Sequence, residues 1–150
     1  MSDEASTYLL VDGENIDATL GIQVLGHRPQ PEERPRWERV RDFSAAVWGQ
    51  PVRPLFFLNA TLDAILDAGR GDVLLASHDA DFVPQLRRLL DAGRQVGVLG
   101  LREFVSVELA GLQDQGMAFY DLEDEVGAFT ALLPRIRIIP LDEFDPRRYL

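Results

Sequence analysis

Apolar residues follow two different spacings along this chain. Short continuous apolar runs are typical of strands buried on both faces, and between them apolar residues recur at the spacing of an amphipathic helix. The runs predict strands over 7–11, 54–59, 72–76, 95–99 and 117–120, with an extra strand at 136–139. Helical spacing predicts helices over 32–49, 61–68, 81–92 and 104–112, and a loop or short helix over 15–21. Because strands and helices alternate, we expect an α/β fold, a three-layer α/β/α sandwich with a central, mainly parallel sheet.

The segment 21–35 interrupts this alternation. It contains Gly26, Pro29 and Pro35, which disfavour regular structure, so we expect it to be irregular. The stretch 26–36 is either a mobile flap or an ordinary loop, and we favour the loop.

Composition and length narrow the class of protein. The chain has 150 residues, of which 46% are hydrophobic and 27% charged, which is typical of one globular domain. We expect a single domain over 1–150, with 134–150 as a C-terminal extension. The absence of cysteine excludes disulfides and thiolate metal sites. No apolar stretch is long enough to span a membrane. The segment 1–4, which carries two acidic residues, does not resemble the start of a signal peptide. We therefore expect a cytoplasmic protein without a membrane partner. The sequence leaves open whether the chain forms a homo-oligomer.

The formal net charge of −10 weighs against generic nucleic-acid binding, which depends on a basic surface. Arginines are nevertheless concentrated in 28–41 and 87–94, and the chain contains no lysine. Guanidinium groups match phosphate oxygens well. A compositional bias of the source genome explains the missing lysine as well, and we favour that explanation.

Carboxylates follow two of the predicted strands directly. Asp12 comes after the run 7–11, and Asp79 and Asp81 come after the run 72–76. Because the carboxyl ends of parallel strands meet at one edge of a sheet, we expect these side chains to converge. Clustered carboxylates repel one another unless a proton or a cation intervenes, and hard divalent cations prefer oxygen ligands. The sequence therefore predicts a Mg²⁺ or Mn²⁺ site.

The neighbours of these aspartates allow more than one interpretation. Asn15 binds a phosphate or a water, or it caps the next helix. Ser77 supports the acidic cluster or caps a helix, and Asp81 is also a residue type common at helix N-termini. His78 lies between the acidic residues, but an exposed loop histidine is the commoner case, so it is left out of the predicted site. Gly13 allows a tight turn and a close approach of the backbone to a ligand.

A further acidic position follows the last predicted strand. Asp121 is well placed to supply another ligand, although a solvated helix start is the interpretation that we favour for the acidic block 121–125.

The two motifs, in this order and register, resemble the NYN domain family of the PIN-like nuclease superfamily. The resemblance rests on the segments 11–15 (Val-Asp-Gly-Glu-Asn) and 77–84 (Ser-His-Asp-Ala-Asp-Phe-Val-Pro), and it continues through 89–100. It covers roughly the first 120 residues. The tail 137–146 is similar to that of actinobacterial members of the family.

The resemblance implies a divalent-metal-dependent ribonuclease that acts on RNA. Carried over by position, Asp12, Asp79 and Asp81 are the metal ligands, Asn15 positions water or phosphate, and Ser77 supports the acidic cluster. One further acidic position of the family lies between its second strand and its Ser-x-Asp-x-Asp strand, and it has no clear counterpart here. Asp63 lies nearest in sequence, but we place it on the solvent face of a helix.

That missing acid motivates an alternative, a PIN-like module that binds RNA or a protein and has lost its catalytic activity. Two other enzyme classes fit poorly. A haloacid dehalogenase-type phosphatase requires an aspartate where this chain has Glu14, and also a lysine. A dinucleotide-dependent dehydrogenase requires a glycine-rich loop after the first strand, which is absent from the sequence.

Overall fold

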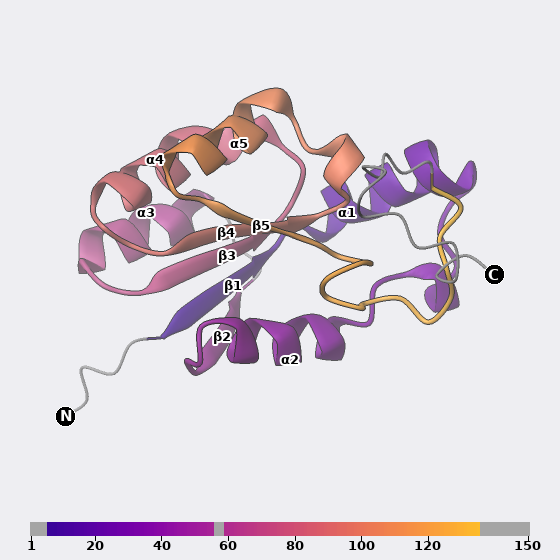
Figure 1. Ribbon diagram of the computed structural model, residues 1–150, viewed down its shortest axis with the longest axis horizontal. Coiled ribbons are helices and arrows are strands. Elements are labelled where there is room, and N and C mark those ends of the chain that lie inside the picture. The colour runs from indigo at the N-terminus through magenta and orange to yellow at the C-terminus, as the bar shows by residue number, and fades with distance from the viewer. Residues whose placement is uncertain (1–5, 56–58, 136–150) are drawn as a thin grey trace, which may run out of the picture.

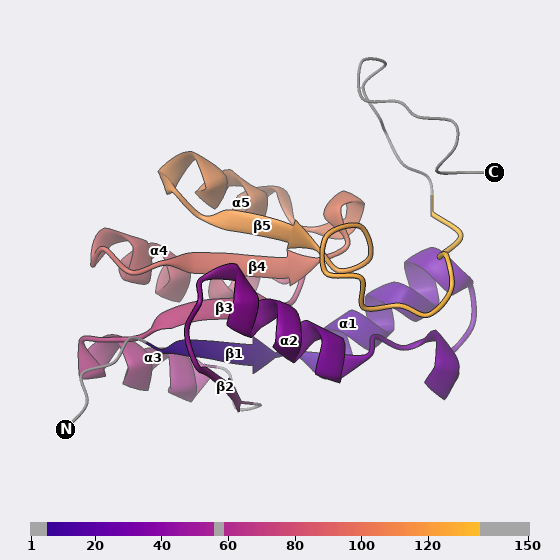
Figure 2. The same ribbon diagram turned by 60° about the horizontal axis from the view of Figure 1, so that its bottom comes forward.

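A parallel sheet forms the centre of the protein. The computed structural model describes residues 6–55 and 59–135. Among them the strands pair in the order β2-β1-β3-β4-β5, and every pairing is parallel. The strands are β1 (Thr7–Val11), β2 (Val52–Leu55), β3 (Asp72–Ala76), β4 (Val96–Gly100) and β5 (Ala118–Asp121). The arrowheads of β1, β4 and β5 point toward the same edge of the sheet, where α1 begins (Figure 2). The predicted three-layer α/β/α fold is confirmed.

Helices cover both faces of the sheet. The α-helices are α1 (Gly13–Thr19), α2 (Trp37–Val47), α3 (Asn59–Ala68), α4 (Val83–Asp91) and α5 (Val107–Gly111). Shorter helical segments are the π-helix η1 (Leu20–Leu25) and the 3₁₀ turns η2 (Pro31–Glu33), η3 (Ala80–Phe82), η4 (Arg102–Phe104) and η5 (Leu112–Gln115). Figure 1 shows α3, α4 and α5 on one side of the sheet and α2 on the other.

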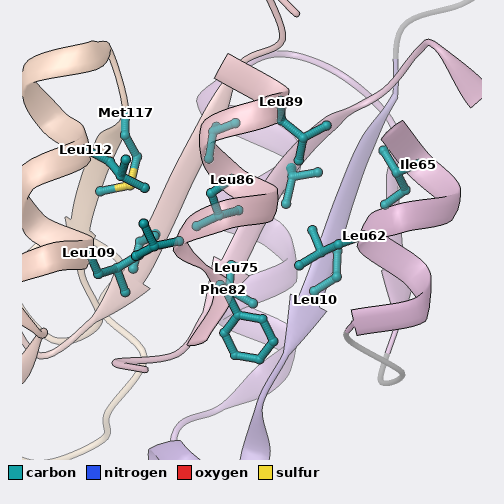
Figure 3. Close-up of a cluster of buried hydrophobic side chains, with 14 residues drawn as sticks. Leu10, Leu62, Ile65, Leu75, Phe82, Leu86, Leu89, Leu109, Leu112 and Met117 are labelled. Carbon is teal, nitrogen blue, oxygen red and sulfur yellow. The ribbon is translucent and has the colours of Figure 1, made fainter. Parts of the chain in front are cut away.

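Two hydrophobic clusters, one on each face, hold these layers together. Leu10 and Leu75 pair across β1 and β3 and point into the cluster beneath α3, α4 and α5 (Figure 3). Leu9 and Leu74, one position earlier on each strand, belong to the cluster on the α1 and α2 side. Successive side chains of a strand point to opposite faces, so a continuous apolar run is what a sheet covered on both sides requires.

Two glycines of β4 allow large neighbours to pack over this strand. A Cβ at Gly97 would lie 2.6 Å from a methyl carbon of Leu74, and a Cβ at Gly100 would lie 3.0 Å from the ring of His78. Larger residues at these positions would force the neighbouring side chains to move. The glycine at position 100 therefore bears on the site described below.

The helix predicted over 32–49 is wrong at its start. The chain forms the 3₁₀ turn η2 and becomes α-helical only at Trp37. Pro35 explains the difference, because proline has no N–H to donate and disfavours helical conformation at the preceding residue.

The segment predicted as irregular over 21–35 begins with regular structure. The π-helix η1 continues α1 as far as Leu25, where the backbone N–H of Gly26 donates to the carbonyl of Gly21 at 2.8 Å. Gly26 then ends the helix with φ of 75°. Helical spacing of apolar residues does not reveal this wider turn, because the expected period is that of an α-helix.

The remaining boundaries differ more modestly from the predictions. The strand predicted over 54–59 is β2, which begins two residues earlier, and position 59 already belongs to α3. The helix predicted over 81–92 begins with the 3₁₀ turn η3, which leads directly into α4. The helix predicted over 104–112 is α5, which begins only at Val107 because Val105 and Ser106 are not helical. The strand predicted at 136–139 lies outside the described residues. Within the part of the chain that the structure describes, no helix combines the length and the apolar character required to cross a bilayer.

Candidate functional site

Asp12 lies beside the segment that carries Ser77 and Asp79, at the carboxyl edge of two neighbouring strands. Val11 ends β1 beside Ala76, the last residue of β3. The backbone N–H of Asp12 then donates to the carbonyl oxygen of Ala76 at 3.0 Å, so the pairing of the two segments extends past the end of β1. This bond places Asp12 next to the segment that carries Ser77 and Asp79.

Ser77 connects the two acidic segments through hydrogen bonds. Its hydroxyl donates to Oδ2 of Asp12 at 3.0 Å and accepts the backbone N–H of Asp79 at 3.1 Å. The Ser77 side chain is fully buried, so these two bonds are the means by which it satisfies its polar atom. Ser77 is not a helix cap, because Asp79 caps the turn η3 by accepting the backbone N–H of Asp81 at 2.9 Å.

The carboxylates of this edge are not neutralised by arginine. Asp12 and Asp79 are half-buried and Asp81 is exposed. Within residues 6–55 and 59–135, none of the three forms an ion pair. The same residues contain no group of three or more histidine, aspartate or glutamate side chains close enough to hold a metal ion. The edge therefore offers the carboxylate of Asp12, which accepts from Ser77, and the carboxylate of Asp79, whose backbone N–H donates to the same hydroxyl, while Asp81 is exposed.

Asn15 is held in one orientation by the segment after β3. Its Oδ1 accepts the backbone N–H of His78 at 2.8 Å and lies 3.1 Å from the Nδ1 of the same residue. Since a backbone N–H requires an acceptor, these contacts fix the oxygen end of the amide toward His78. The amide nitrogen of Asn15 therefore points away from His78. Asn15 lies inside α1, which Asp12 precedes as the N-cap residue, so the capping interpretation of Asn15 is wrong.

His78 is buried, with 5% of its surface exposed, and the expectation of an exposed loop histidine is wrong. Its Nε2 accepts the backbone N–H of Leu101 at 2.8 Å, which leaves the ring proton on Nδ1, where it donates to Asn15. Burial lowers the pKa of His78 to about 4, with the nearby Arg135 acting in the same direction and Asp121 opposing it. The ring is therefore neutral near pH 7.

Sequence reasoning missed this role of His78. Its contacts reach Asn15 in α1 and Leu101 after β4, far away in the sequence. The signal available in the sequence was Gly100, whose missing side chain leaves room for the imidazole ring. That signal becomes meaningful only once the pairing of β3 with β4 is known.

Asp121 is neither a solvated helix start nor a free ligand. It is completely buried, and both its oxygens accept from the guanidinium group of Arg135, at 2.9 and 2.6 Å. Arg135 also pairs with Glu103 and Glu123, and 1% of its side chain is exposed. The hydrogen bonds from Arg135 and from backbone N–H groups keep the pKa of Asp121 well below its usual value, although burial opposes this. This cluster already contains its cation.

Gly13 begins α1 without the positive φ that only glycine adopts easily. A Cβ at this position would meet no atom within 4 Å. The fold therefore does not require glycine here, and the space beside Asp12 is open to solvent.

Comparison with known proteins adds information on the fold. No protein-family model and no curated protein matches the chain. The crystal structure of a protein of unknown function from Vibrio parahaemolyticus is similar, with a TM-score of 0.57 and 17% sequence identity over 83% of this chain and 97% of that chain. At this identity the similarity supports the α/β/α architecture and carries no information on activity.

Proposed function

We propose that this protein is a divalent-metal-dependent ribonuclease of the NYN type, whose site is the sheet edge around Asp12 and Asp79. The observation that supports the proposal is that the hydroxyl of Ser77 binds the carboxylate of Asp12 and the backbone N–H of Asp79, two acidic residues that follow neighbouring strands. Neither residue is paired with an arginine within the described residues. Carboxylates that lie at one edge without a positive partner favour a cation taken from solution.

The residues present fit a Mg²⁺ or Mn²⁺ ion. Magnesium usually retains several waters and is held by one or two carboxylates together with oxygens of a phosphate substrate. Asp12 and Asp79 satisfy this requirement, because each has one oxygen in a hydrogen bond and a second oxygen without one in the described structure. Asp81 is proposed as the third, outer ligand. When bound, such a cation supplies Lewis-acid stabilisation of the phosphate and acidifies a nearby water.

The other residues have roles that follow from their contacts. His78 fixes Asn15 so that its amide NH₂ is directed away from the imidazole and is available to donate to a phosphate oxygen. Ser77 holds the carboxylate of Asp12 and the backbone of Asp79 at a fixed separation. Donors that are positioned before the substrate arrives stabilise developing negative charge effectively.

The test of the proposal is cleavage of a labelled single-stranded RNA with Mn²⁺, comparing the wild type with Asp79→Asn. Removing the charge of Asp79 from the acidic edge is expected to reduce cleavage by more than the ~10–100-fold typical of losing an outer-shell partner. Asp91→Asn is the matched control, because Asp91 is exposed at the opposite end of α4. Equal cleavage by wild type and Asp79→Asn would refute the assignment.

The second candidate function is an RNA- or protein-binding module without catalytic activity. It is favoured by the absence, in the described part of the chain, of a three-residue acidic group able to hold a metal. Calorimetric titration with Mn²⁺ distinguishes the two candidates. Millimolar Mn²⁺ without measurable binding to the wild type would favour the binding module, whereas binding that is lost in Asp79→Asn supports the nuclease.

A further inference from the structure

A pocket of about 570 Å³ lies beside α1 and η1, at the end of α1 away from Asp12. Its volume falls within the ~300–1,000 Å³ that is usual for small-molecule sites. It is formed by one face of the helix and by the loop that folds back over it, and its lining residues are Asp17, Ala18, Gly21, Ile22, Gly26, His27, Arg28 and Pro29.

The wide turn of η1 and the glycine at position 21 shape this pocket. A Cβ at Gly21 would lie 3.0 Å from both the carbonyl oxygen of His27 and a ring carbon of Pro29, so the loop packs directly on the helix backbone. Helical segments with this wider turn are uncommon and frequently occur at functional sites.

An ion pair and a hydrogen bond hold the loop, and the charge of Arg28 has no partner among the described residues. Asp17 pairs with Arg34 at 3.2 Å, and His27 lies 3.0 Å from a carboxylate oxygen of Glu33. Arg28 is exposed and has no ion pair or hydrogen bond within the described residues. The negative charge that lines the pocket is therefore neutralised by a neighbour, whereas the positive charge of Arg28 is not.

The pocket and the acidic edge belong to one continuous helical segment. Asp12 precedes α1, and Gly21 lies nine residues later in η1. At ~1.5 Å per residue these positions are about 13 Å apart along the helix. A stacked nucleic-acid strand rises ~3.4 Å per nucleotide, so about four nucleotides span this distance.

We infer that the pocket binds a nucleotide of single-stranded RNA whose cleaved phosphate lies at the acidic edge, with Arg28 contacting a backbone phosphate. This inference rests on the proposed function, because it identifies the class of substrate as a single strand several nucleotides long. The base enters the apolar and glycine-rich part of the pocket, beside Ala18 and Ile22. The remaining charge of Arg28 offsets the acidity of the chain at this point.

The experiment measures binding without cleavage, by fluorescence anisotropy of labelled uridine oligonucleotides in EDTA. Arg28→Ala is expected to weaken binding of an eight-nucleotide RNA about three- to tenfold, as expected for the loss of one charge-assisted phosphate contact. Its salt dependence is expected to fall by ~0.7 in the slope of log K against log salt, which corresponds to one contact with a single strand. Arg87→Ala, at an exposed position on α4, is the matched control and is expected to leave both quantities unchanged.

A second variant blocks the pocket without changing the charge. Ala18 is exposed on α1, and Ala18→Leu preserves high helix propensity while filling part of the pocket. Ala64→Leu, at an exposed position of α3, is its control. The gain in affinity on lengthening the RNA from two to eight nucleotides is expected to shrink in Ala18→Leu and to persist in Ala64→Leu.

The possible results separate this inference from the proposed function. Unchanged affinity and salt dependence in both Arg28→Ala and Ala18→Leu would overturn the inference, even if the protein cleaves RNA with Mn²⁺. Weakened binding in both variants supports the pocket, and if the wild type then fails to cleave RNA, the proposed catalysis alone is lost.

Discussion

Replacing Arg135 with methionine is expected to destabilise the protein by about 3 kcal/mol at pH 7. The side chain of Arg135 is almost completely buried, and its ion-pair partner Asp121 is fully buried. Methionine cannot replace the charge or the hydrogen bonds of the guanidinium group. Removing one partner of a buried pair costs ~3–5 kcal/mol, because the other charge is left uncompensated. We expect the lower end of this range, since the carboxylate keeps three backbone donors, from Arg102, Glu123 and Asp124.

The penalty is also expected to depend on pH. In the wild type the pKa of Asp121 is lowered from its usual 3.8, so its contribution to stability is complete above that value and is lost as the pH falls below it. In Arg135→Met the burial remains while the guanidinium is gone, so the pKa of Asp121 rises and the carboxyl takes up a proton more easily. The difference in stability between the two proteins therefore shrinks as the pH falls from 7 toward 4.

Urea unfolding, followed by tryptophan fluorescence, measures this difference. With a slope of ~2 kcal/mol per M, a loss of about 3 kcal/mol lowers the unfolding midpoint by about 1.5 M. The double variant Asp121→Asn, Arg135→Met removes both charges and is expected to be more stable than Arg135→Met alone at pH 7. A loss below about 1 kcal/mol, or a loss that stays constant between pH 7 and 4, would refute the account of the cluster.

Four further results are expected from the acidic edge. Gly13→Ala should raise the free energy of unfolding by ~0.4–1 kcal/mol in urea, because the added methyl group meets no atom. The same variant should slow RNA cleavage, because the methyl group occupies the space beside Asp12 where the proposed function places the RNA phosphate. Asn15→Asp retains the acceptor for His78 but loses the amide NH₂, so circular dichroism should show an unchanged fold while the rate of RNA cleavage falls at least about tenfold. The pKa of His78 is lowered on folding, so below pH 6.5 the unfolded chain takes up a proton on this imidazole more readily than the folded chain does. The free energy of unfolding should therefore fall by up to about 3 kcal/mol as the pH falls from 6.5 to about 4. In His78→Gln this part of the pH profile, measured by urea unfolding, should be flatter. Mn²⁺ at 100 times its Kd should stabilise the wild type by ~2.7 kcal/mol in thermal unfolding and leave Asp79→Asn unchanged.

The sequence specifies the sheet well because its strands are buried on both faces. The run from Val73 to Ala76 contains no polar residue, and the structure makes it the strand β3. The convergence of Asp12 and Asp79 on one edge follows from the parallel order of β1 and β3, which the alternation of elements predicts. These conclusions need only the period of the apolar pattern and the geometry of parallel strands.

The features that sequence reasoning missed depend on contacts between distant segments. The burial of His78 requires Gly100 beside it, and the burial of Asp121 requires Arg135. Gly100 becomes a signal only once β3 is known to pair with β4, and Arg135 is not distinguished in the sequence from the other arginines of the chain. The π-helix η1 was not predicted for a different reason. Its backbone hydrogen bonds follow a wider turn, which the spacing of apolar residues does not reveal.

Two groups of acidic residues at the carboxyl edge of the sheet differ in whether the folded chain balances their charge. Asp121, at the end of β5, is surrounded by an arginine and backbone donors, so its charge is balanced within the folded chain. After β1 and β3, Ser77 binds the carboxylate of Asp12 and the backbone N–H of Asp79, and neither aspartate has an arginine partner in the described residues. The same fold therefore pairs Asp121 with a cation of its own and leaves Asp12 and Asp79 without one in the described residues. Carboxylates without a positive partner do not add to stability, so the proposed function assigns the edge beside the oriented amide of Asn15 to binding a cation and a phosphate.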